Sequence, residues 1–474
     1  MAGSSGRTGR EGACDQRDGA PPGAGPARRH VLGWGLGAAG TALVAPAASA
    51  AAAGGNAAVQ DATVAHTWVA TAYSAVQLEN LTPPTAARAY AHVAMAMYEA
   101  VLPGMPHHRS FAGQLNGLSG RASGLLPHAG RGRLDWQVAL SVAARDCLLG
   151  VLPLRSAQTR PLLVAAHDAV VAERRRTGAS ARVITESEAR GRAVAAVLGA
   201  WARGDGHADA ISRPYTPPSG EPWLWESTPP NYRPAIEPFC TDIRPLVLRS
   251  TGEVETEPHV PFSTDADSAF HAQAAATYEQ SLRNGEEERA IARFWTDNPG
   301  SFTPPSGTAT GLPAGHWMLI CSRTTRQLGL RLDETLEALA RLGVTLHDSF
   351  LSCWTEKYRS NLLRPVTYVN RYIDPSWLSF VNTPQFPEHT SGHSVSSAAA
   401  AVVLTDLLGS FGFVDDSHGA RYPARRFSSF QDAALEAAGS RLFGGIHYPM
   451  GIESGLLQGR EIGDLVVRRL RTRR

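Results

Sequence analysis

Apolar residues recur at helical spacing along most of the chain. The stretch from about residue 64 to residue 203 is rich in alanine, leucine and valine, and a similar pattern resumes near residue 266 and continues to the C-terminus. No alternation of apolar and polar residues between hairpin turns recurs, as strands would require. The pattern predicts an all-α protein.

Proline-rich stretches divide these helices. Residues 213–245 contain many helix breakers and are expected to form an irregular connector along the surface. A second loop, at 298–305, interrupts the later helices. We therefore expect an N-terminal helical region, 56–250, that ends in the connector, and a C-terminal helical bundle, 265–474.

Composition and charge narrow the class of protein. Of the 474 residues, 43% are hydrophobic but only 7% are aromatic, which favours helices rich in alanine and leucine. The length suffices for two or three domain-sized cores. The net charge of +2 gives no support for binding to nucleic acid or to a membrane surface. After the N-terminal leader, no segment reaches about 20 uninterrupted apolar residues, so the mature chain is expected to lack an integral membrane segment.

The N-terminus, residues 1–50, has the features of an export signal. Arg28 and Arg29 precede a short apolar, glycine-rich stretch, and Ala48 and Ala50 suit cleavage after Ala50. A twin arginine of this kind is typical of the twin-arginine pathway, which would place the protein in the periplasm or outside the cell. The alternative is a general secretory leader, or a tail whose arginine pair is accidental.

Cysteine usage argues against a metal centre built on thiolates. The cysteines of the mature chain are widely scattered and show no metal-ligand spacing, so we expect buried free thiols and no zinc site. They are Cys147, Cys240, Cys321 and Cys353.

A basic pair lies near the end of a predicted helix. Residues 345–363 contain no glycine or proline and carry apolar residues at helical intervals. Lys357 and Arg364 are seven residues apart, which returns a helix to within roughly 20° of its starting direction, so both side chains can point the same way. Pro365 disfavours helical geometry at Arg364 and is expected to end the helix there. Alternatively, the pair is simply two basic residues on a solvated helix.

A Ser-Gly-His motif, Ser391-Gly392-His393, runs directly into the alanine-rich stretch 394–404. This order predicts a helix that begins at the motif. The free amides and the positive end of the helix dipole would face an anion, Gly392 would let the main chain come close, and the Ser391 hydroxyl would add a donor. Alternatively, Ser391 is an ordinary helix cap and His393 merely lies in the first turn.

Arg441 and His447 flank a pair of glycines. On one unbroken helix the two side chains would lie about 120° apart and would converge poorly. Gly444 and Gly445 are expected to break the helix, so that His447 can turn back toward Arg441 from a separate segment. A lone histidine is more often a core or surface group, and only the combination of the three motifs points to a shared site.

Together, these side chains are cations, hydrogen-bond donors and imidazoles, without the carboxylates that usually chelate a divalent metal. Such a set suits a tetrahedral oxyanion. The order Lys-x6-Arg-Pro, Ser-Gly-His and Ser-Arg-x5-His resembles the vanadium-dependent haloperoxidases and their relatives, the type 2 phosphatidic acid phosphatases. Segments 83–101, 294–297 and 315–317 also resemble the bacterial haloperoxidase branch. The resemblance implies two packed four-helix-type bundles with long irregular connecting loops, and places the site in the second bundle.

The resemblance also implies a role for each motif residue. His447 would bind vanadium, His393 would be the acid–base histidine, and Lys357 would polarise bound peroxide. The residues expected to hold the vanadate oxygens are Lys357, Arg364, Ser391, Gly392 and Arg441. Two aromatic residues, Phe386 and Trp354, match the wall of the halide pocket, although they suit an ordinary core equally well.

The sequence departs from the family pattern near both histidines. His389 and Thr390 stand where a tyrosine and a proline are usual, and His389 could add a second titrating group. Gly451 replaces an aspartate that would orient the metal-binding histidine. Glu453 or a backbone carbonyl could take over that role, and otherwise vanadate affinity could be weak. Asp297 is the candidate acidic neighbour of the arginines, unless it is a surface carboxylate.

The resemblance implies a vanadate-dependent haloperoxidase that oxidises halide with hydrogen peroxide and halogenates a small organic substrate. The alternative is an acid phosphatase, a phosphomonoesterase that uses the same pocket without vanadate, with His447 as nucleophile and His393 as the acid. The long N-terminal half without a membrane segment and the aromatic pair favour the peroxidase. A third hypothesis is a binding protein that has lost catalysis, for which Gly451 is the only indication.

Overall fold

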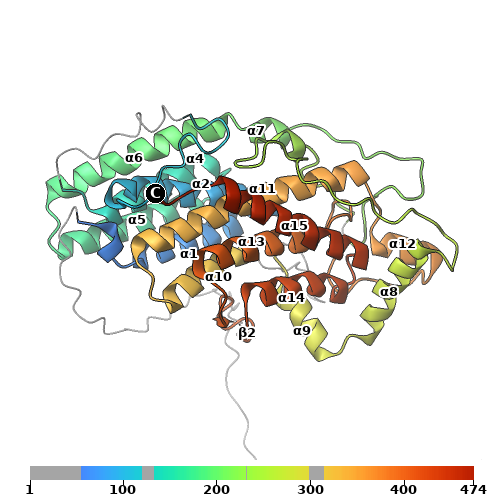
Figure 1. Ribbon diagram of the computed structural model, residues 1–474. Coiled ribbons are helices and arrows are strands. Elements are labelled where there is room, and N and C mark those ends of the chain that lie inside the picture. Colours follow the sequence, from blue (N-terminus) through green and yellow to red (C-terminus); the bar gives the residue numbers. More distant parts are fainter. Residues whose placement is uncertain (1–54, 120–132, 231, 298–313) are drawn as a thin grey trace, which may run out of the picture. The chain divides into compact units, whose positions relative to one another are not determined.

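The structure is a computed structural model that describes residues 55–119, 133–230, 232–297 and 314–474. These residues are mostly helical and confirm the predicted all-α class (Figure 1). The expected export signal at 1–50 and the predicted loop at 298–305 lie outside the described residues.

The first group of helices surrounds a buried central helix. The group consists of α1 (Thr63–Glu79), α2 (Pro83–Val101), α4 (Trp136–Val151), α5 (Thr159–Arg176) and α6 (Ala181–Arg203). Helix α2 contacts α4 and α6, and all of its residues except Thr85 are buried. Its polar side chains need partners at that depth. Arg88, for example, pairs with Asp205 at 2.6 Å.

The long helix α11 (Leu332–Ser360) packs on α2 and also on the second group of helices (Figure 1). It ends at Ser360 because Asn361 takes a left-handed conformation, with φ 45°. Arg364 therefore lies outside α11, in an extended conformation before α12 (Pro365–Tyr372). The helix predicted over 345–363 is confirmed as far as Ser360, but the expectation that Arg364 lies at the end of the same helix as Lys357 is wrong. The effect of the proline on the residue before it is confirmed.

The second group packs against α11. It consists of α13 (Gly392–Leu408), α14 (Phe430–Phe443) and α15 (Pro449–Arg469). Helices α13 and α15 approach closely because α15 presents glycines to α13. A Cβ at Gly459 would lie 2.2 Å from the carbonyl oxygen of Val395, and a Cβ at Gly455 would lie 2.9 Å from that of Ser391. This close packing fixes the N-terminus of α13, where the Ser-Gly-His motif lies.

Shorter elements complete the described fold. The helices are α7 (His207–Ala210), α8 (Ala269–Arg283), α9 (Glu286–Phe294) and α10 (His316–Gln327), and the 3-10 turns are Ala57–Val59, Leu102–Gly104 and Cys240–Asp242. The described residues between α7 and α8 form a long irregular connector. An antiparallel pair, β1 (Phe413–Asp415) and β2 (Arg425–Phe427), was not expected, because three-residue strands leave no alternating run in the sequence.

Two further expectations can be compared with the fold. The four cysteines of the described chain are buried and free, as predicted. Among the described helices, none combines the length and the apolar character needed to cross a membrane.

Candidate active site

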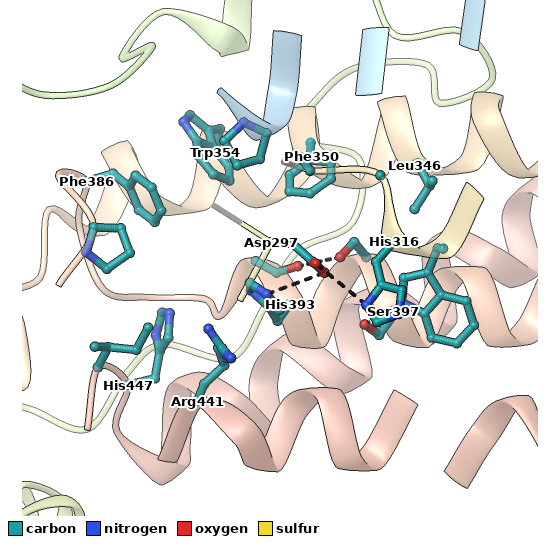
Figure 2. Close-up of a pocket in the computed structure, with 18 of the residues that line it drawn as sticks. Asp297, His316, Leu346, Phe350, Trp354, Phe386, His393, Ser397, Arg441 and His447 are labelled. Carbon is teal, nitrogen blue, oxygen red and sulfur yellow. Dashed lines mark hydrogen bonds and ion pairs between the residues drawn. The ribbon is translucent and has the colours of Figure 1, made fainter. Parts of the chain in front are cut away.

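A cavity of about 60 Å³ lies between α10, α11, α13 and α14. A water molecule needs about 10–15 Å³ by the same measure, so the cavity can hold a small oxyanion. Figure 2 shows its two unlike sides, with aromatic side chains of Phe386, Trp354 and Phe350 on one side and His447 and Arg441 on the other. Of the residues predicted from the motifs, those that line the cavity are Trp354, Phe386, Gly392, His393, Arg441 and His447.

Helix α13 begins at the Ser-Gly-His motif, as predicted. Ser391 is the N-cap residue, and its Oγ accepts a hydrogen bond from the Ser394 amide at 3.4 Å. Gly392 opens the helix and lines the cavity, and His393 follows in the first turn. Amides of a first turn have no partner within the helix. The motif therefore presents hydrogen-bond donors and the positive end of a dipole at the cavity.

His393 lies in the cavity wall with 21% of its side chain exposed. Its Nε2 is 2.7 Å from the carbonyl oxygen of Trp295, and because a carbonyl only accepts, Nε2 carries the proton. Burial, followed by the positive charge of Arg441, lowers the pKa of His393 to about 3. The ring is therefore neutral at pH 7, with its lone pair on Nδ1.

His447 lies after the predicted glycine break, where Gly445 takes a φ of 72°. Its Nδ1 is 2.8 Å from Oε1 of Glu388, and its Nε2 is 3.2 Å from a guanidinium nitrogen of Arg364. A guanidinium only donates, so Nε2 accepts and Nδ1 carries the proton. Burial, followed by the charges of Arg364 and Lys357, holds the pKa of His447 well below its usual range. This ring is also neutral, with its lone pair on Nε2.

Glu388 is a site residue that the sequence did not reveal. It is fully buried, and its Oε1 also accepts a hydrogen bond from the Tyr448 amide at 3.0 Å. Gly451 leaves the space for it, because a Cβ there would lie 2.4 and 2.7 Å from the two carboxylate oxygens. Glu453, expected as a replacement for the missing aspartate, is exposed on α15 instead. That expectation is wrong, and so is the alternative of a backbone carbonyl, since the acceptor for His447 is Glu388.

The two arginines are buried: Arg441 lines the cavity, whereas Arg364 lies behind its wall, against His447 and Phe386. Arg364 donates from Nε to Phe386 O at 2.8 Å and from NH1 to Ile446 O at 2.7 Å, while its NH2 is buried without a partner. Arg441 donates from NH2 to Ala292 O at 3.2 Å. Burial lowers the pKa of each arginine to about 10. Both remain charged at pH 7, and Arg364 keeps an unused donor.

Lys357 lies behind the cavity wall. Its ammonium group donates to the carbonyl oxygens of Pro387 at 3.1 Å, Glu388 at 3.0 Å and Thr390. These bonds use all three of its donors, so Lys357 holds the loop that leads to Ser391. Burial lowers its pKa to about 8. A direct contact between Lys357 and a bound anion remains a prediction.

Three buried cations thus gather without a carboxylate partner. Lys357 and Arg364 are 0% exposed and Arg441 is 2% exposed, and within the described part of the chain none of them forms an ion pair with a carboxylate. Glu388 and Asp297 act on these charges only from beyond ion-pair distance, and a buried charge without an ion-pair partner costs several kcal/mol. Together with the unpartnered nitrogen of Arg364, these charges make a site that an anion would complete.

The predicted aromatic pair lies against two of these cations, Lys357 and Arg364. The Phe386 ring centroid lies 5.0 Å from Nζ of Lys357 and 4.8 Å from Cζ of Arg364. The rings of Phe386 and Trp354 are 4.7 Å apart and belong to one buried apolar cluster. Both residues therefore line the cavity and belong to the core at the same time, and cation–π contacts hold the charges against this wall.

A chain of carboxylates and imidazoles extends from His393 into the interior (Figure 2). Asp297 lies 3.8 Å from His393 and 3.6 Å from Nδ1 of His316, whose Nε2 is 2.7 Å from Asp415. Burial alone would lower the pKa of His316, but the charges of Asp415 and Asp297 outweigh burial and raise the pKa to about 10. His316 is therefore cationic at pH 7. Asp297 contacts histidines and acts on Arg441 only through its charge.

His389 lies away from the cavity. Its ring is buried and stands 5.9 Å from that of His259. Burial lowers the pKa of His389 to about 3. The expectation of a second titrating group at the site is therefore wrong.

Comparison with known proteins decides the family. The family model described as the VCPO second helical-bundle domain matches residues 337–473, a range that contains every motif residue predicted above. The crystal structure of the first bacterial vanadium-dependent iodoperoxidase matches at 35% identity with a TM-score of 0.78, over 87% of this chain and 97% of that chain. This chain belongs to the vanadium-dependent haloperoxidase family.

Two further haloperoxidase structures share the fold. Holo-type and apo-type crystal structures of bacterial vanadium-dependent chloroperoxidase match with TM-scores of 0.58 and 0.60 at 14% and 13% identity. They cover 82% of this chain and 93% and 94% of theirs. No curated protein sequence matches the chain. For this member of the haloperoxidase family, the roles of individual side chains therefore rest on the geometry of its own cavity.

Proposed function

We propose that the chain is a vanadate-dependent haloperoxidase that oxidises a halide, with iodide as the preferred one, by means of hydrogen peroxide. The observation that carries the proposal is the cluster of three buried cations without carboxylate partners beside two neutral imidazoles. The 35% identity to a bacterial vanadium-dependent iodoperoxidase supports the choice of cofactor and halide.

The residues present fit vanadate. The unpartnered NH2 of Arg364 and the first-turn amides at Gly392 can donate to oxygens, and Nε2 of His447 offers a nitrogen lone pair. No group of three or more His, Cys, Asp or Glu side chains in the described ranges forms a metal-ion site. When bound, vanadate would supply a Lewis-acidic centre that polarises hydrogen peroxide.

Each side chain then has a stated task. His447 would bind the metal through Nε2, while Arg364 and Arg441 would hold the oxygens. Nδ1 of His393 carries the lone pair and would accept and return a proton during turnover. Lys357 would keep the loop before Ser391 in place.

The aromatic side of the cavity supports the choice of iodide. Phe386, Trp354 and Phe350 offer an apolar wall across the cavity from Arg441 and His447. Transfer of an anion to an apolar wall costs least for the largest and most weakly hydrated halide. We therefore expect turnover to decrease from iodide to bromide to chloride.

The proposal is tested with protein purified without metal. We expect oxidation of iodide by hydrogen peroxide to require added orthovanadate, and Arg441→Ala to lower kcat by about 10²–10³-fold, as loss of an oxyanion donor does. Arg460→Ala, which removes an exposed arginine of α15, is the matched control and should behave like the wild type.

Other outcomes have clear meanings. Hydrolysis of p-nitrophenyl phosphate that vanadate inhibits, without halide oxidation, would favour the phosphatase. Tight vanadate binding without either activity would indicate a binding protein. Activity that does not depend on vanadate would contradict the proposal.

A further inference from the structure

We infer that Glu388 is the positioning residue for His447, and that residue 451 is a glycine so that Glu388 can reach the ring. The inference deepens the proposed function and rests on it, because His447 is the residue proposed to bind vanadate. It concerns a carboxylate that comes from the loop before α13 rather than from α15.

The contacts of Glu388 converge on the segment that carries His447. One oxygen, Oε1, accepts from Nδ1 of His447 at 2.8 Å and from the amide of Tyr448 at 3.0 Å. The carboxylate therefore holds both the ring and the adjoining main chain. Glu388 itself is fixed from its own backbone, since its amide donates to Leu362 O and its carbonyl accepts from Lys357.

These contacts determine which nitrogen of His447 is available. With Nδ1 donating to Glu388, the lone pair stays on Nε2, and the guanidinium of Arg364 faces that nitrogen at 3.2 Å. Both neighbours require the same tautomer, since Arg364 has donors only. An outer carboxylate of this kind fixes the orientation of a ligating imidazole and increases its basicity.

The space for Glu388 exists only because residue 451 has no side chain. A Cβ at Gly451 would lie 2.4 Å from Oε1 and 2.7 Å from Oε2 of Glu388, too close for any real contact. The position is also fixed, because the carbonyl oxygen of Gly451 accepts from the Ser391 amide at 2.9 Å. Residues 388 and 451 therefore compete for one volume, and a carboxylate can enter it from either side.

This competition predicts an exchange. An aspartate at 451 would place its oxygens near the point that Oε1 of Glu388 now occupies, because its Cβ would already lie beside that point. The experiment therefore compares Glu388→Ala, Gly451→Asp and the double variant. Glu388→Gln keeps an acceptor for both donors. Glu453→Ala removes an exposed carboxylate of α15 and is the matched control.

Two readouts are needed, and circular dichroism with thermal melting confirms folding for each variant. The first is the ¹⁵N chemical shifts of the His447 ring in protein without vanadate, assigned with His447→Gln. The second is the Kd for orthovanadate without peroxide or halide. We expect Glu388→Ala to lose the pure Nδ1–H tautomer and to bind vanadate about 10–100-fold more weakly. Glu388→Gln should keep the tautomer, and Glu453→Ala should match the wild type in both readouts.

The double variant decides between positioning and mere structural support. We expect Gly451→Asp alone to weaken binding, because it overlaps with Glu388, and the double variant to bind more tightly than either single variant. A folded Glu388→Ala protein with unchanged tautomer and Kd would overturn the inference, as would a double variant no better than Glu388→Ala. If wild-type protein binds no vanadate, the proposed function fails, while the ring tautomer still tests the role of Glu388.

Discussion

The two histidines of the cavity are held in opposite ways. His447 donates from Nδ1 to the buried carboxylate of Glu388 at 2.8 Å and keeps its lone pair on Nε2. His393 donates from Nε2 to a backbone carbonyl, that of Trp295, at 2.7 Å and keeps its lone pair on Nδ1. The first ring is 3% exposed and the second 21%. The difference suits a fixed ligand on one side and a proton carrier on the other.

The electrostatic surroundings of the two histidines also suit a fixed ligand at His447 and a proton carrier at His393. Besides burial, the charges of Arg364, Lys357 and Arg441 keep His447 neutral. His393 also faces Asp297, which favours a proton on its ring and lies 3.8 Å away. A proton on His393 is therefore less costly than a proton on His447, as acid–base catalysis requires.

The largest expected effect separates these two roles. His447→Ala should weaken vanadate binding by more than about 100-fold, since loss of an outer carboxylate alone costs about 10–100-fold. His393→Ala should leave vanadate affinity within about tenfold of the wild type but lower kcat for iodide oxidation by about 10²–10⁴-fold. Vanadate titration and steady-state kinetics at saturating vanadate measure the two quantities.

The exposed His107 provides the control for removal of an imidazole. His107→Ala should leave both vanadate affinity and kcat unchanged. If His393→Ala lost vanadate as completely as His447→Ala, the two rings would share one role and the comparison would fail.

The chemistry of the site could be predicted from the sequence, whereas its connections could not. The start of α13 at Gly392 and the helix break before His447 follow from local residue preferences. The end of α11 was misplaced because left-handed Asn361 stops the helix before the proline does. Glu388 and His316 were missed because their partners lie 59 and 99 residues away. Such pairs are formed by the packing of distant segments, which no local pattern shows.

A second prediction concerns the pH dependence of stability on the His393 side. Asp415 and Asp297 raise the pKa of His316 to about 10 against the effect of burial, above the 6.5 of an unfolded histidine. Its contribution to the free energy of unfolding is therefore complete below about pH 6.5 and is lost as the pH rises toward 10. The free energy of unfolding of the wild type should exceed that of His316→Gln by on the order of a few kcal/mol near pH 6.5, and by less at pH 9.5.

The contribution of His393 to stability should change with pH in the opposite direction. Burial lowers its pKa to about 3, so its neutral form contributes fully above about pH 6.5 and the contribution is lost as the pH falls. The difference between wild type and His393→Gln should therefore shrink from pH 6.5 to pH 5. Urea unfolding at pH 5, 6.5, 8 and 9.5 measures both differences. If the two differences in the free energy of unfolding changed with pH in the same direction, His316 would not be held as a cation.

The smallest effect tests the aromatic wall across the cavity from His447. Phe386→Leu keeps an apolar side chain but removes the ring that lies 5.0 Å from Nζ of Lys357 and 4.8 Å from Cζ of Arg364. Each cation–π contact is worth about 0.5–2 kcal/mol, so we expect vanadate affinity to fall about 2–10-fold. Phe350→Leu is the matched control, because Phe350 lines the same cavity without a cation over its ring among the described residues. If both variants weakened vanadate binding equally, the wall would act through its apolar volume alone.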